Sequence, residues 1–370
     1  MKGPLCLAET VPLKMRISAL RLQDFRNYSF QEVELGAGLH VFEGRNAQGK
    51  TALLEAVYLG ATARSFRTSK EADLIRWGQP GGGLHLSMER DSGRPRELSM
   101  RWQAQPLLRK ILLQDQPVRR LADFLSELPL ALFTPDDLEL VQGGPELRRA
   151  YLDLLLCKLY PAYLEALGRY QKVLRQKGAL LRTQRSPDRG ELASWDELLM
   201  QFGMLIVGFR RELCSQLQPR LAYLYAELSG EAQALTLTYR PCVEEDFAAA
   251  LERARGEELR RRSPLVGPHR DEVQLCLGEA VVRRFGSQGQ RRTLALAMRL
   301  AQAEVLLEIG KERPVVLLDD CFSELDPGRQ ARLLAWLEGA SQVLITTATP
   351  LDLSPAHRLY RVDEGQVFPC

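Results

Sequence analysis

The segment Gly44–Thr51 constrains the fold of this 370-residue chain more than any other feature. It reads GRNAQGKT and matches the pattern G-x-x-x-x-G-K-T completely. An apolar run at 39–43 precedes it and a helical pattern at 50–61 follows, as at the opening of an α/β nucleotide-binding fold. In such a loop the backbone N–H groups and the helix N-terminus face a pyrophosphate. We therefore expect eight nucleotide-binding residues: Gly44, Arg45, Asn46, Ala47, Gln48, Gly49, Lys50 and Thr51.

The end of the loop also predicts a metal site. Lys50 can reach the β- and γ-phosphates, and the Thr51 hydroxyl is placed to bind Mg²⁺. A second oxygen ligand is expected where the apolar run VVLL at 315–318 ends in Asp319 and Asp320, because strand ends meet at the ligand crevice of such sheets. We expect Asp319 to hold Mg²⁺ through water and Asp320 to activate the attacking water. The alternative for this pair is an ordinary acidic turn.

The distance between these two motifs defines the organisation of the chain. Lys50 and Asp319 are 269 residues apart, whereas compact GTPases and kinases close this gap within one small domain. Such a split is typical of ATP-binding-cassette ATPases, so we predict an α/β P-loop ATPase head with mixed sheets and an inserted α-helical arm. The expected parts are a first half of the head at 15–135, the arm at 136–262, a second half at 263–370, and an extension outside the fold at 1–14.

Two further segments fit the cassette pattern. Ser287, Gln288, Gly289 and Gln290 precede a helical pattern of about twenty residues. In cassette ATPases this signature binds the γ-phosphate held by the opposite subunit, which predicts an ATP-dependent homodimer. The segment SELD at 323–326 matches the loop that touches the partner subunit, so Asp326 is expected near the nucleotide. The alternative for the first segment is a simple helix cap.

The match to transporters of this class is incomplete. Thr346 and Thr347 stand where transporters carry a switch histidine, and the junction at 133–137 holds no convincing glutamine loop. Gln142 is the nearest candidate for that glutamine.

Composition excludes several classes of protein. With 50 Lys and Arg against 47 Asp and Glu, the net charge of +3 excludes a histone-like binder held to nucleic acid by bulk charge. No apolar run approaches the roughly 20 residues of a membrane span, and no signal peptide is evident. The seven cysteines are scattered without a C-x-x-C pair, which favours reduced thiols and no zinc site. We expect a cytoplasmic protein.

Residues 146–182 and 194–229 show apolar side chains at helical spacing, and the linker 183–190 predicts an antiparallel pair of helices. The stretch 148–189 carries ten basic and three acidic residues. Two interpretations remain open: these charges pair within the chain or face solvent, or they contact DNA phosphates.

Five segments together resemble the RecF family of bacterial recombination-mediator ATPases, over nearly all of 15–370. They are LQDFRNY at 22–28, the N-x-x-G-K-T-x-L-L-E-A block at 46–56, SFRT at 65–68, GPHRD at 267–271, and the LLDD and SELD block at 317–326.

The resemblance implies an ATPase of DNA replication and repair that dimerises on ATP, hydrolyses it slowly with stimulation by DNA, and binds double-stranded and gapped DNA. With RecR and RecO it would help load RecA onto single-strand gaps in the SOS response, in association with the nucleoid. It implies that Arg26 and Asn27 lie at the nucleotide. Candidate DNA contacts are Arg64, Arg67, Lys70 and Arg270.

Two other hypotheses stay open at this point. The chain could be the ATPase subunit of a membrane transporter, against which the missing histidine argues. It could also be a DNA-binding scaffold whose ATPase is degenerate, against which the intact Lys50, Thr51 and Asp319 argue.

Overall fold

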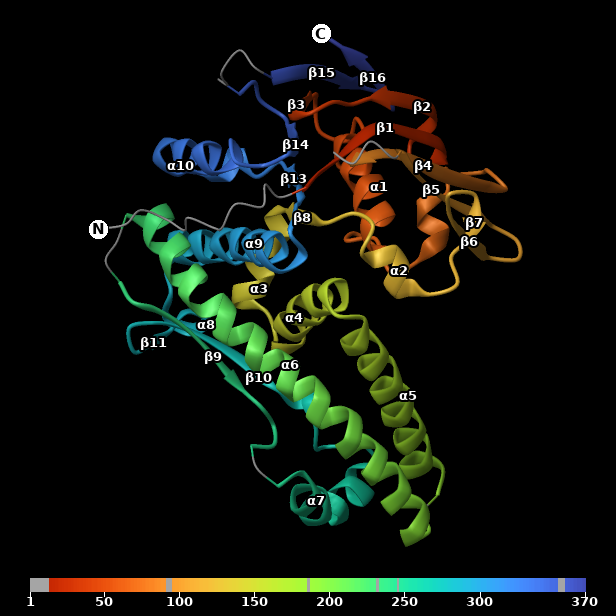
Figure 1. Cartoon of the computed structure of the whole chain (residues 1–370), viewed down its shortest axis with the longest axis vertical. Coiled ribbons are helices and arrows are strands. Elements are labelled where there is room, and N and C mark those ends of the chain that lie inside the picture. Colours follow the sequence, from red (N-terminus) through yellow and green to blue (C-terminus); the bar gives the residue numbers. More distant parts are fainter. Residues whose placement is uncertain (1–12, 91–94, 185–186, 231–232, 245, 352–356) are drawn as a thin grey trace. The chain divides into compact units, whose positions relative to one another are not determined.

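The computed structural model describes residues 13–90, 95–184, 187–230, 233–244, 246–351 and 357–370. The chain forms two compact units: one comprises the residues up to Pro135 together with Ala303–Cys370, and the other comprises Asp136–Gln302 (Figure 1). The first unit is therefore assembled from two segments that are distant in the sequence. The domain boundaries expected from the sequence stay predictions. The expected extension at 1–14 lies largely outside the described residues.

A six-stranded sheet carries the phosphate-loop motif in the first unit. Its order is β16-β15-β3-β14-β13-β8, and all neighbours are parallel except β15 and β16. Every residue of β13 and β14 is buried, as expected for central parallel strands. The strands are β3 (Gly38–Glu43), β8 (Leu130–Phe133), β13 (Val315–Asp319), β14 (Gln342–Thr347), β15 (His357–Asp363) and β16 (Gln366–Pro369).

A second, seven-stranded sheet completes the first unit. It runs β12-β1-β4-β5-β6-β7 with β2 paired to β1, and it is antiparallel except for the pair β1 and β12. The strands are β1 (Leu13–Phe25), β2 (Tyr28–Glu34), β4 (Gly81–Arg90), β5 (Pro95–Gln103), β6 (Leu108–Leu113), β7 (Gln116–Pro117) and β12 (Glu312–Arg313).

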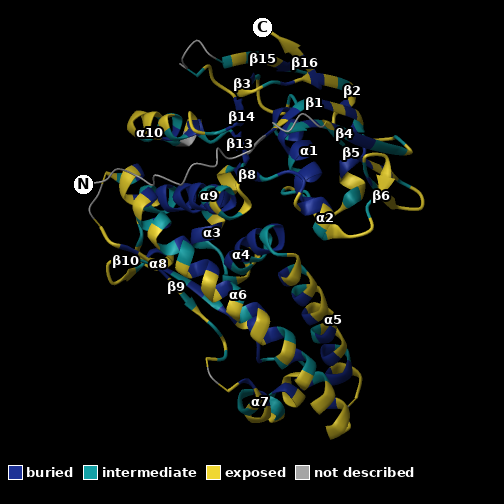
Figure 2. Cartoon of the chain, viewed as in Figure 1, coloured by how far each residue is buried: buried dark blue, intermediate teal, exposed yellow. Residues whose placement is uncertain are grey.

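Helix α1 (Lys50–Thr62) contacts strands of both sheets and is buried along almost its whole length (Figure 2). The central position of α1 explains why its sequence is apolar all round rather than on one stripe. It also fixes the phosphate-loop motif, which ends where the helix begins. The other helical elements of this unit are η1 (Glu71–Leu74), α2 (Leu121–Leu125), η2 (Pro135–Asp137, at the boundary), η4 (Phe322–Glu324) and α10 (Pro327–Leu337).

The second unit is mainly helical. It holds α3 (Leu138–Gln142), α4 (Pro145–Leu159), α5 (Pro161–Thr183), α6 (Arg189–Ser229), α7 (Phe247–Arg261), η3 (Pro268–Arg270), α8 (Val282–Phe285) and most of α9 (Gln288–Gly310). A three-stranded antiparallel sheet, β11-β10-β9, accompanies them, with β9 (Leu235–Arg240), β10 (Glu272–Leu277) and β11 (Ala280–Val281).

The expected antiparallel pair of helices is present as α5 and α6, but the helical stretch expected at 146–182 is two helices. Tyr160 is extended, with φ −131°, and Pro161 begins α5. A proline disfavours helical backbone in the residue before it and lacks the N–H that would continue the ladder, so α4 must end there.

Helix α6 is, among the described residues, the one helix long and apolar enough to cross a membrane by length and composition. The same test is passed by core helices of globular domains. Two of its charged residues pair with neighbouring elements of the same unit: Asp196 lies 2.6 Å from Lys177 Nζ, and Arg210 Nη2 lies 2.8 Å from Asp153 Oδ1. These ion pairs favour a helix that packs within the unit.

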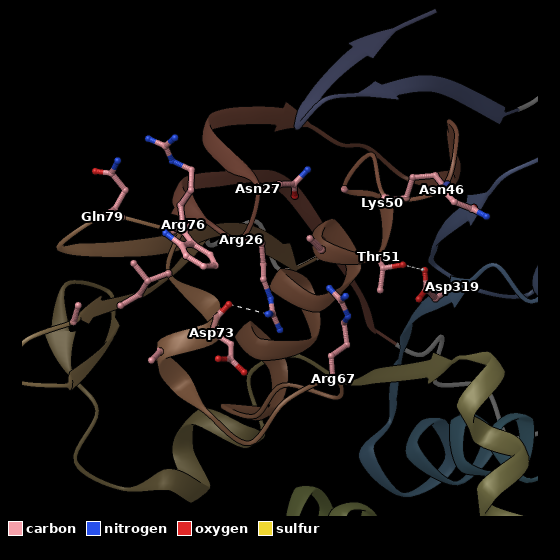
Figure 3. A pocket seen from close by; sticks show the side chains of 18 of the residues that line it. Arg26, Asn27, Asn46, Lys50, Thr51, Arg67, Asp73, Arg76, Gln79 and Asp319 are labelled. Carbon is pink, nitrogen blue, oxygen red and sulfur yellow. Dashed lines mark hydrogen bonds between the residues drawn. The ribbon is translucent and has the colours of Figure 1, made fainter.

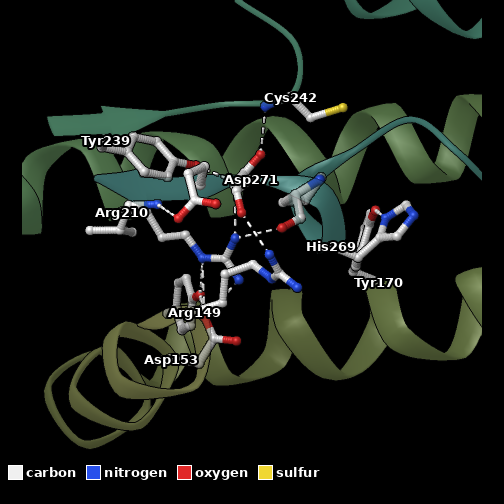
Figure 4. Close-up of polar contacts among 12 residues, drawn as sticks. Arg149, Asp153, Tyr170, Arg210, Tyr239, Cys242, His269 and Asp271 are labelled. Carbon is white, nitrogen blue, oxygen red and sulfur yellow. Dashed lines mark hydrogen bonds and ion pairs between the residues drawn. The ribbon is translucent and has the colours of Figure 1, made fainter. Parts of the chain in front are cut away.

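A buried polar network centres on Asp271, in the segment GPHRD (Figure 4). Asp271 Oδ2 lies 2.9 Å from Arg210 Nη1 and also accepts from the Tyr239 hydroxyl, while Oδ1 accepts from the Cys242 backbone N–H at 2.8 Å. Arg210 in turn donates to the Pro268 carbonyl at 2.7 Å. The network therefore ties α6 and the end of β9 to the turn that presents Arg270.

The basic charges of 148–189 are partly paired. Lys177 is buried and lies 2.6 Å from both Asp196 and Glu258, and Arg148 lies 2.9 Å from Glu272. A different group of basic side chains on α5 and the start of α6 is exposed: Lys172, Arg175, Arg182 and Arg189. Ion pairs within the chain thus account for the buried charges of Lys177 and Arg148. The four exposed basic side chains are accessible to a partner.

Candidate nucleotide-binding site

A cleft of about 1000 Å³ lies at the start of α1 in the first unit. Figure 3 shows its labelled side chains, with Thr51 and Asp319 on one side and Arg76 and Gln79 on the other. The cleft brings together ten of the residues predicted from the sequence: Arg26, Asn27, Asn46, Ala47, Gly49, Lys50, Thr51, Arg67, Asp319 and Asp320.

The backbone of the loop adopts conformations that its sequence permits. Ala47 has φ +65° and Gly49 has φ +117°. A Cβ on Gly49 would lie 2.7 Å from both Asn27 Nδ2 and the Tyr28 hydroxyl, so both the conformation and the space require glycine here. Gly49 is also the N-cap of α1, whose first-turn N–H groups have no side-chain cap. Such a helix start is suited to an anion.

Two neighbouring turns hold the phosphate loop in place through hydrogen bonds to its backbone carbonyls. From the turn between β1 and β2, Asn27 Nδ2 donates to the Gln48 carbonyl at 2.9 Å and the Tyr28 hydroxyl donates to the Gly49 carbonyl at 3.0 Å. From the turn between β15 and β16, the Gly365 N–H donates to the Gln48 carbonyl at 3.0 Å. The segment DFRNY therefore positions the loop, and Gln48 is occupied in holding it rather than lining the cleft.

Lys50 lies within the curl of the loop. Its Nζ donates to the Gly44 and Arg45 carbonyls at 2.7 and 2.8 Å. Burial lowers the pKa of the Lys50 ammonium, and the carboxylates of Asp320 and Asp319 oppose that shift. Gly44 and Arg45 thus contribute backbone oxygens, and neither residue lines the cleft.

Thr51 and Asp319 meet at the floor of the cleft. The Thr51 hydroxyl donates to Asp319 Oδ1 at 2.9 Å, and the Thr346 hydroxyl donates to the same oxygen at 2.7 Å. Burial raises the pKa of the Asp319 carboxyl, and these two hydrogen bonds oppose the shift. In the sequence Thr346 stood out only because it lies where transporters carry a switch histidine. In the structure its hydroxyl orients the Asp319 carboxylate.

This donor set fits Mg²⁺. A hydroxyl and a carboxylate are hard oxygen ligands, and Mg²⁺ in phosphate-transfer sites is held by one or two protein oxygens together with substrate phosphates and water. Within the described ranges no group of three or more His, Cys, Asp or Glu side chains could hold a metal by itself. Thr51 and Asp319 therefore offer a partial ligand set, which the phosphates of a nucleotide and water would complete around Mg²⁺.

Asp320 lies in the wall of the cleft, directly after Asp319 in the sequence. Its φ is +47°, and its N–H donates to both the Thr346 carbonyl and the Thr346 hydroxyl at 3.1 Å. Its Oδ1 is buried and has no hydrogen-bond partner within the described part of the chain. An unpaired carboxylate oxygen in the wall of a polar cleft is suited to accept a hydrogen bond from water.

Glu55 is one of the residues whose role the sequence did not indicate. It is fully buried on α1, and its two carboxylate oxygens accept from Arg26 Nε at 2.8 Å and from Arg26 Nη2 at 2.5 Å. Ser65 and Arg67 also contact it, at 2.5 and 3.3 Å. Glu55 thus joins the DFRNY and SFRT segments beneath the cleft. The available signal was a lone glutamate in the apolar run of a buried helix.

The expected signature lies in the second unit. The Gln290 N–H donates to the Ser287 hydroxyl oxygen at 3.2 Å, and the Ser287 N–H donates to Gln290 Oε1 at 2.9 Å. This reciprocal pair is a capping box at the start of α9. Within the described residues the Ser287 hydroxyl only accepts a hydrogen bond, so its own hydrogen is available to a ligand. In the first unit Asp326 caps α10 by accepting from the Arg329 N–H at 3.0 Å.

The candidate DNA contacts fall in two places. A second depression of about 650 Å³ in the first unit is lined by Arg64, Arg67 and Lys70, together with Arg109, which the sequence reasoning did not single out. Arg270 is exposed in the second unit, beside the buried Asp271. Gln142 ends α3 in the second unit and is absent from the lining of the cleft. The roles expected of these residues stay predictions.

Comparison with known proteins decides the family. The profile of the RecF/RecN/SMC N terminal domain matches residues 16–367. A protein of Synechococcus sp. (strain JA-2-3B'a(2-13)) named "DNA replication and repair protein RecF" is 38% identical, with 96% of this chain and 98% of that protein aligned. The chain belongs to the RecF family. A RecF protein of Herpetosiphon aurantiacus is also 38% identical, with 96% of this chain and 100% of that protein aligned.

Solved structures agree with this assignment. A structure described as the recombination mediator protein RecF-ATP in the RecFOR pathway superposes with a TM-score of 0.90 at 26% identity, covering 98% of this chain and 99% of that one. An Smc head domain of Pyrococcus furiosus superposes with a TM-score of 0.57 at 14% identity over 96% of each chain, which shows a shared fold. The predicted RecF resemblance and the predicted α/β ATPase-head fold with its helical insertion are confirmed.

Proposed function

We propose that this protein is an ATP-dependent DNA-binding ATPase of DNA replication and repair. The observation that carries the proposal is the hydrogen bond between Thr51 and Asp319, beside Lys50, in a cleft large enough for a nucleotide. Relatives named RecF and the ATP-bound RecF structure support ATP as the substrate. The cassette-ATPase motifs, which also allowed the hypothesis of a transporter subunit, are accounted for by membership of the RecF family.

In the proposed mechanism the loop and the start of α1 bind the phosphates of ATP through backbone N–H groups. Lys50 exchanges its contacts with the Gly44 and Arg45 carbonyls for contacts with the phosphates. Asp320 accepts a proton from the attacking water or orients that water. The pairing of Glu55 with Arg26 keeps the walls of the cleft in place during turnover.

Thr51 and Asp319 would hold Mg²⁺, Thr51 directly and Asp319 through water. When bound, the ion neutralises charge on the β- and γ-phosphates and orients them for in-line attack. Thr346 keeps Asp319 Oδ1 turned toward Thr51, because its hydroxyl donates to that oxygen.

Hydrolysis is proposed to depend on a homodimer. Ser287, which directly precedes α9, would donate its hydroxyl hydrogen to the γ-phosphate bound by the partner subunit. The helix N-terminus around that phosphate would be formed by Gln288, Gly289 and Gln290. Asp326 would lie at the same contact. Loss of the γ-phosphate removes this bond, so hydrolysis releases the dimer and makes DNA binding reversible.

Double-stranded and gapped DNA are the proposed ligands of the dimer. Arg64, Arg67, Lys70 and Arg270 are the proposed phosphate contacts, supplemented by the exposed basic row of α5. Since the chain's net charge is only +3, two copies joined by ATP would bind DNA more tightly than one. By analogy with the RecFOR pathway we propose RecR and RecO as partners in loading RecA at gaps, in the cytoplasm at the nucleoid.

The test measures binding of a labelled gapped duplex with ADP and with a slowly hydrolysed ATP analogue, and ATP turnover with and without DNA. The proposal expects tighter DNA binding with the analogue and DNA-stimulated turnover, both lost in Lys50→Ala. DNA binding that ignores nucleotide, with turnover unchanged by DNA, would instead support a scaffold with a degenerate ATPase. The exposed Arg101→Ala is the matched control and should behave as the wild type.

A further inference from the structure

Trp77 is the most exposed large apolar side chain in the described part of the protein. It is 97% exposed, although it belongs to the wall of the cleft that contains Lys50 and Thr51. Its sequence neighbours Arg76 and Gln79 lie on the side of the cleft away from Thr51 and Asp319 (Figure 3). A solvent-exposed indole gains nothing from packing, so its position calls for a ligand rather than a role in the core.

The backbone that carries Trp77 is held firmly. Residues 76–79 form a turn in which the Gln79 N–H donates to the Arg76 carbonyl at 3.0 Å, and Gly78 has the positive φ of +79° that such a turn requires. The Arg76 N–H donates to the Asp24 carbonyl at 2.8 Å, and Arg76 Nε donates to Asp24 Oδ1 at 2.8 Å. The indole is thus exposed at the tip of a pinned turn, not on a loose loop.

Trp77 has no partner of its own within the described residues: it makes no hydrogen bond, ring contact or cation–π contact there. The other aromatic side chain next to this turn, Phe25, is buried against Trp102 instead. The two ends of the cleft therefore have different chemistry. One end offers phosphate ligands, and the other offers a flat apolar ring flanked by an arginine and a glutamine.

We propose that Trp77 stacks on the base of the nucleotide whose phosphates the loop holds. This inference rests on the proposed function and adds the base subsite to it. A nucleoside triphosphate is long and has a flat ring at the end away from the γ-phosphate, which matches the arrangement of this cleft. Because every nucleobase has a π-face, stacking by itself selects weakly among bases. ATP and GTP should therefore bind with affinities within about tenfold of each other, since most of the binding comes from stacking and phosphate contacts.

The experiment compares two ligands on the whole chain: ATP and inorganic tripolyphosphate, which has the phosphates but no base. Dissociation constants are measured by calorimetry in the presence of Mg²⁺ for the wild type, Trp77→Ala and Trp77→Phe. Trp77→Ala should bind ATP about 5- to 150-fold more weakly, the range found for one lost aromatic stack. Its affinity for tripolyphosphate should not change, and Trp77→Phe should recover most of the ATP affinity.

The control is Phe30→Ala, which removes another aromatic ring that is 54% exposed in the same unit but outside the lining of the cleft. It should leave both affinities unchanged. The inference is overturned if Trp77→Ala binds ATP as the wild type does, or if it loses ATP and tripolyphosphate equally. It is also overturned, in favour of a platform for a DNA base, if the variant loses only affinity for single-stranded DNA.

Failure of the proposed function gives a different result. If the wild type binds neither ATP nor tripolyphosphate, the loop is not a phosphate site, and the base subsite falls with it. If the wild type binds both ligands equally well and Trp77→Ala changes neither, the phosphate site stands and only the base subsite is wrong.

Discussion

The Thr51 hydroxyl donates a 2.9 Å hydrogen bond to Asp319 Oδ1, although 268 residues of sequence separate the two. Thr51 is the second residue of α1, and Asp319 is the last residue of β13. The contact therefore joins the two segments from which the first unit is built. The two residues are in contact although the helical insertion lies between them in the sequence. The proposed Mg²⁺ site requires this contact between Thr51 and Asp319.

Asp319→Asn tests this contact. The amide keeps the shape of the side chain but cannot supply an anionic oxygen to Mg²⁺, so ATP turnover should fall by about 100-fold or more while the fold is kept. Steady-state phosphate release and the circular dichroism spectrum check both parts. Asp115→Asn, in an exposed turn at φ +59° that asparagine tolerates, is the control and should retain full turnover.

Glu55→Gln tests the buried pair beneath the cleft. The change leaves the Arg26 guanidinium, whose side chain is 18% exposed, without its anion, so the free energy of unfolding should fall by about 3–5 kcal/mol. Urea unfolding measures it. Glu89→Gln breaks the exposed pair with Arg16 and should cost at most about 1 kcal/mol. Equal losses in the two variants would show that Glu55 does not have the role assigned to it.

Gly49→Ala tests the geometry of the loop. The new Cβ would lie 2.7 Å from Asn27 Nδ2 at a φ of +117°, so the variant should lose nucleotide binding and at least about 2 kcal/mol of stability. Gly310→Ala places a Cβ in open space at the end of α9 and should be neutral or slightly stabilising. Nucleotide affinity and thermal unfolding of the two variants, measured side by side, decide the point; wild-type affinity in Gly49→Ala would contradict the description of the loop.

The pH dependence of stability tests the network around GPHRD. Burial lowers the pKa of His269 to about 4, below its ordinary value near 6.5, and its Nδ1 lies 2.6 Å from the Tyr170 hydroxyl. Between these two pH values the unfolded chain binds the proton and the folded chain does not. Stability from this group is therefore complete above about pH 6.5 and is lost as the pH falls toward 4.

The variant His269→Gln isolates that contribution, because glutamine keeps hydrogen-bonding ability but does not titrate. Unfolding by urea should show a loss of about 2–3 kcal/mol between pH 6.5 and 4.5 in the wild type beyond the loss in the variant. Parallel curves for the two proteins over this range would mean that His269 is not held neutral.

The sequence predicted the parts of the site that depend on local geometry. The loop at 44–51, the strand end at Asp319 and the cap at Ser287 each carry a pattern that a short segment of backbone requires by itself. Glu55, Thr346 and the Gly365 contact were missed because their roles come from segments far apart in the sequence. The break at Pro161 had a local signal, since proline starts a helix and ends the one before it. Burial of Lys177 against Glu258 had none, because charge alone does not tell which lysine is buried.

The most direct test of the central claim is the molar mass in solution, by light scattering, with ADP and then with a slowly hydrolysed ATP analogue. The account predicts 41.8 kDa with ADP and about twice that with the analogue. Ser287→Arg should bind the analogue yet stay at 41.8 kDa, because the arginine blocks the contact across the dimer without touching the loop. A wild-type mass that is the same with both nucleotides, or a Ser287→Arg variant that still dimerises, would contradict an ATP-switched dimer.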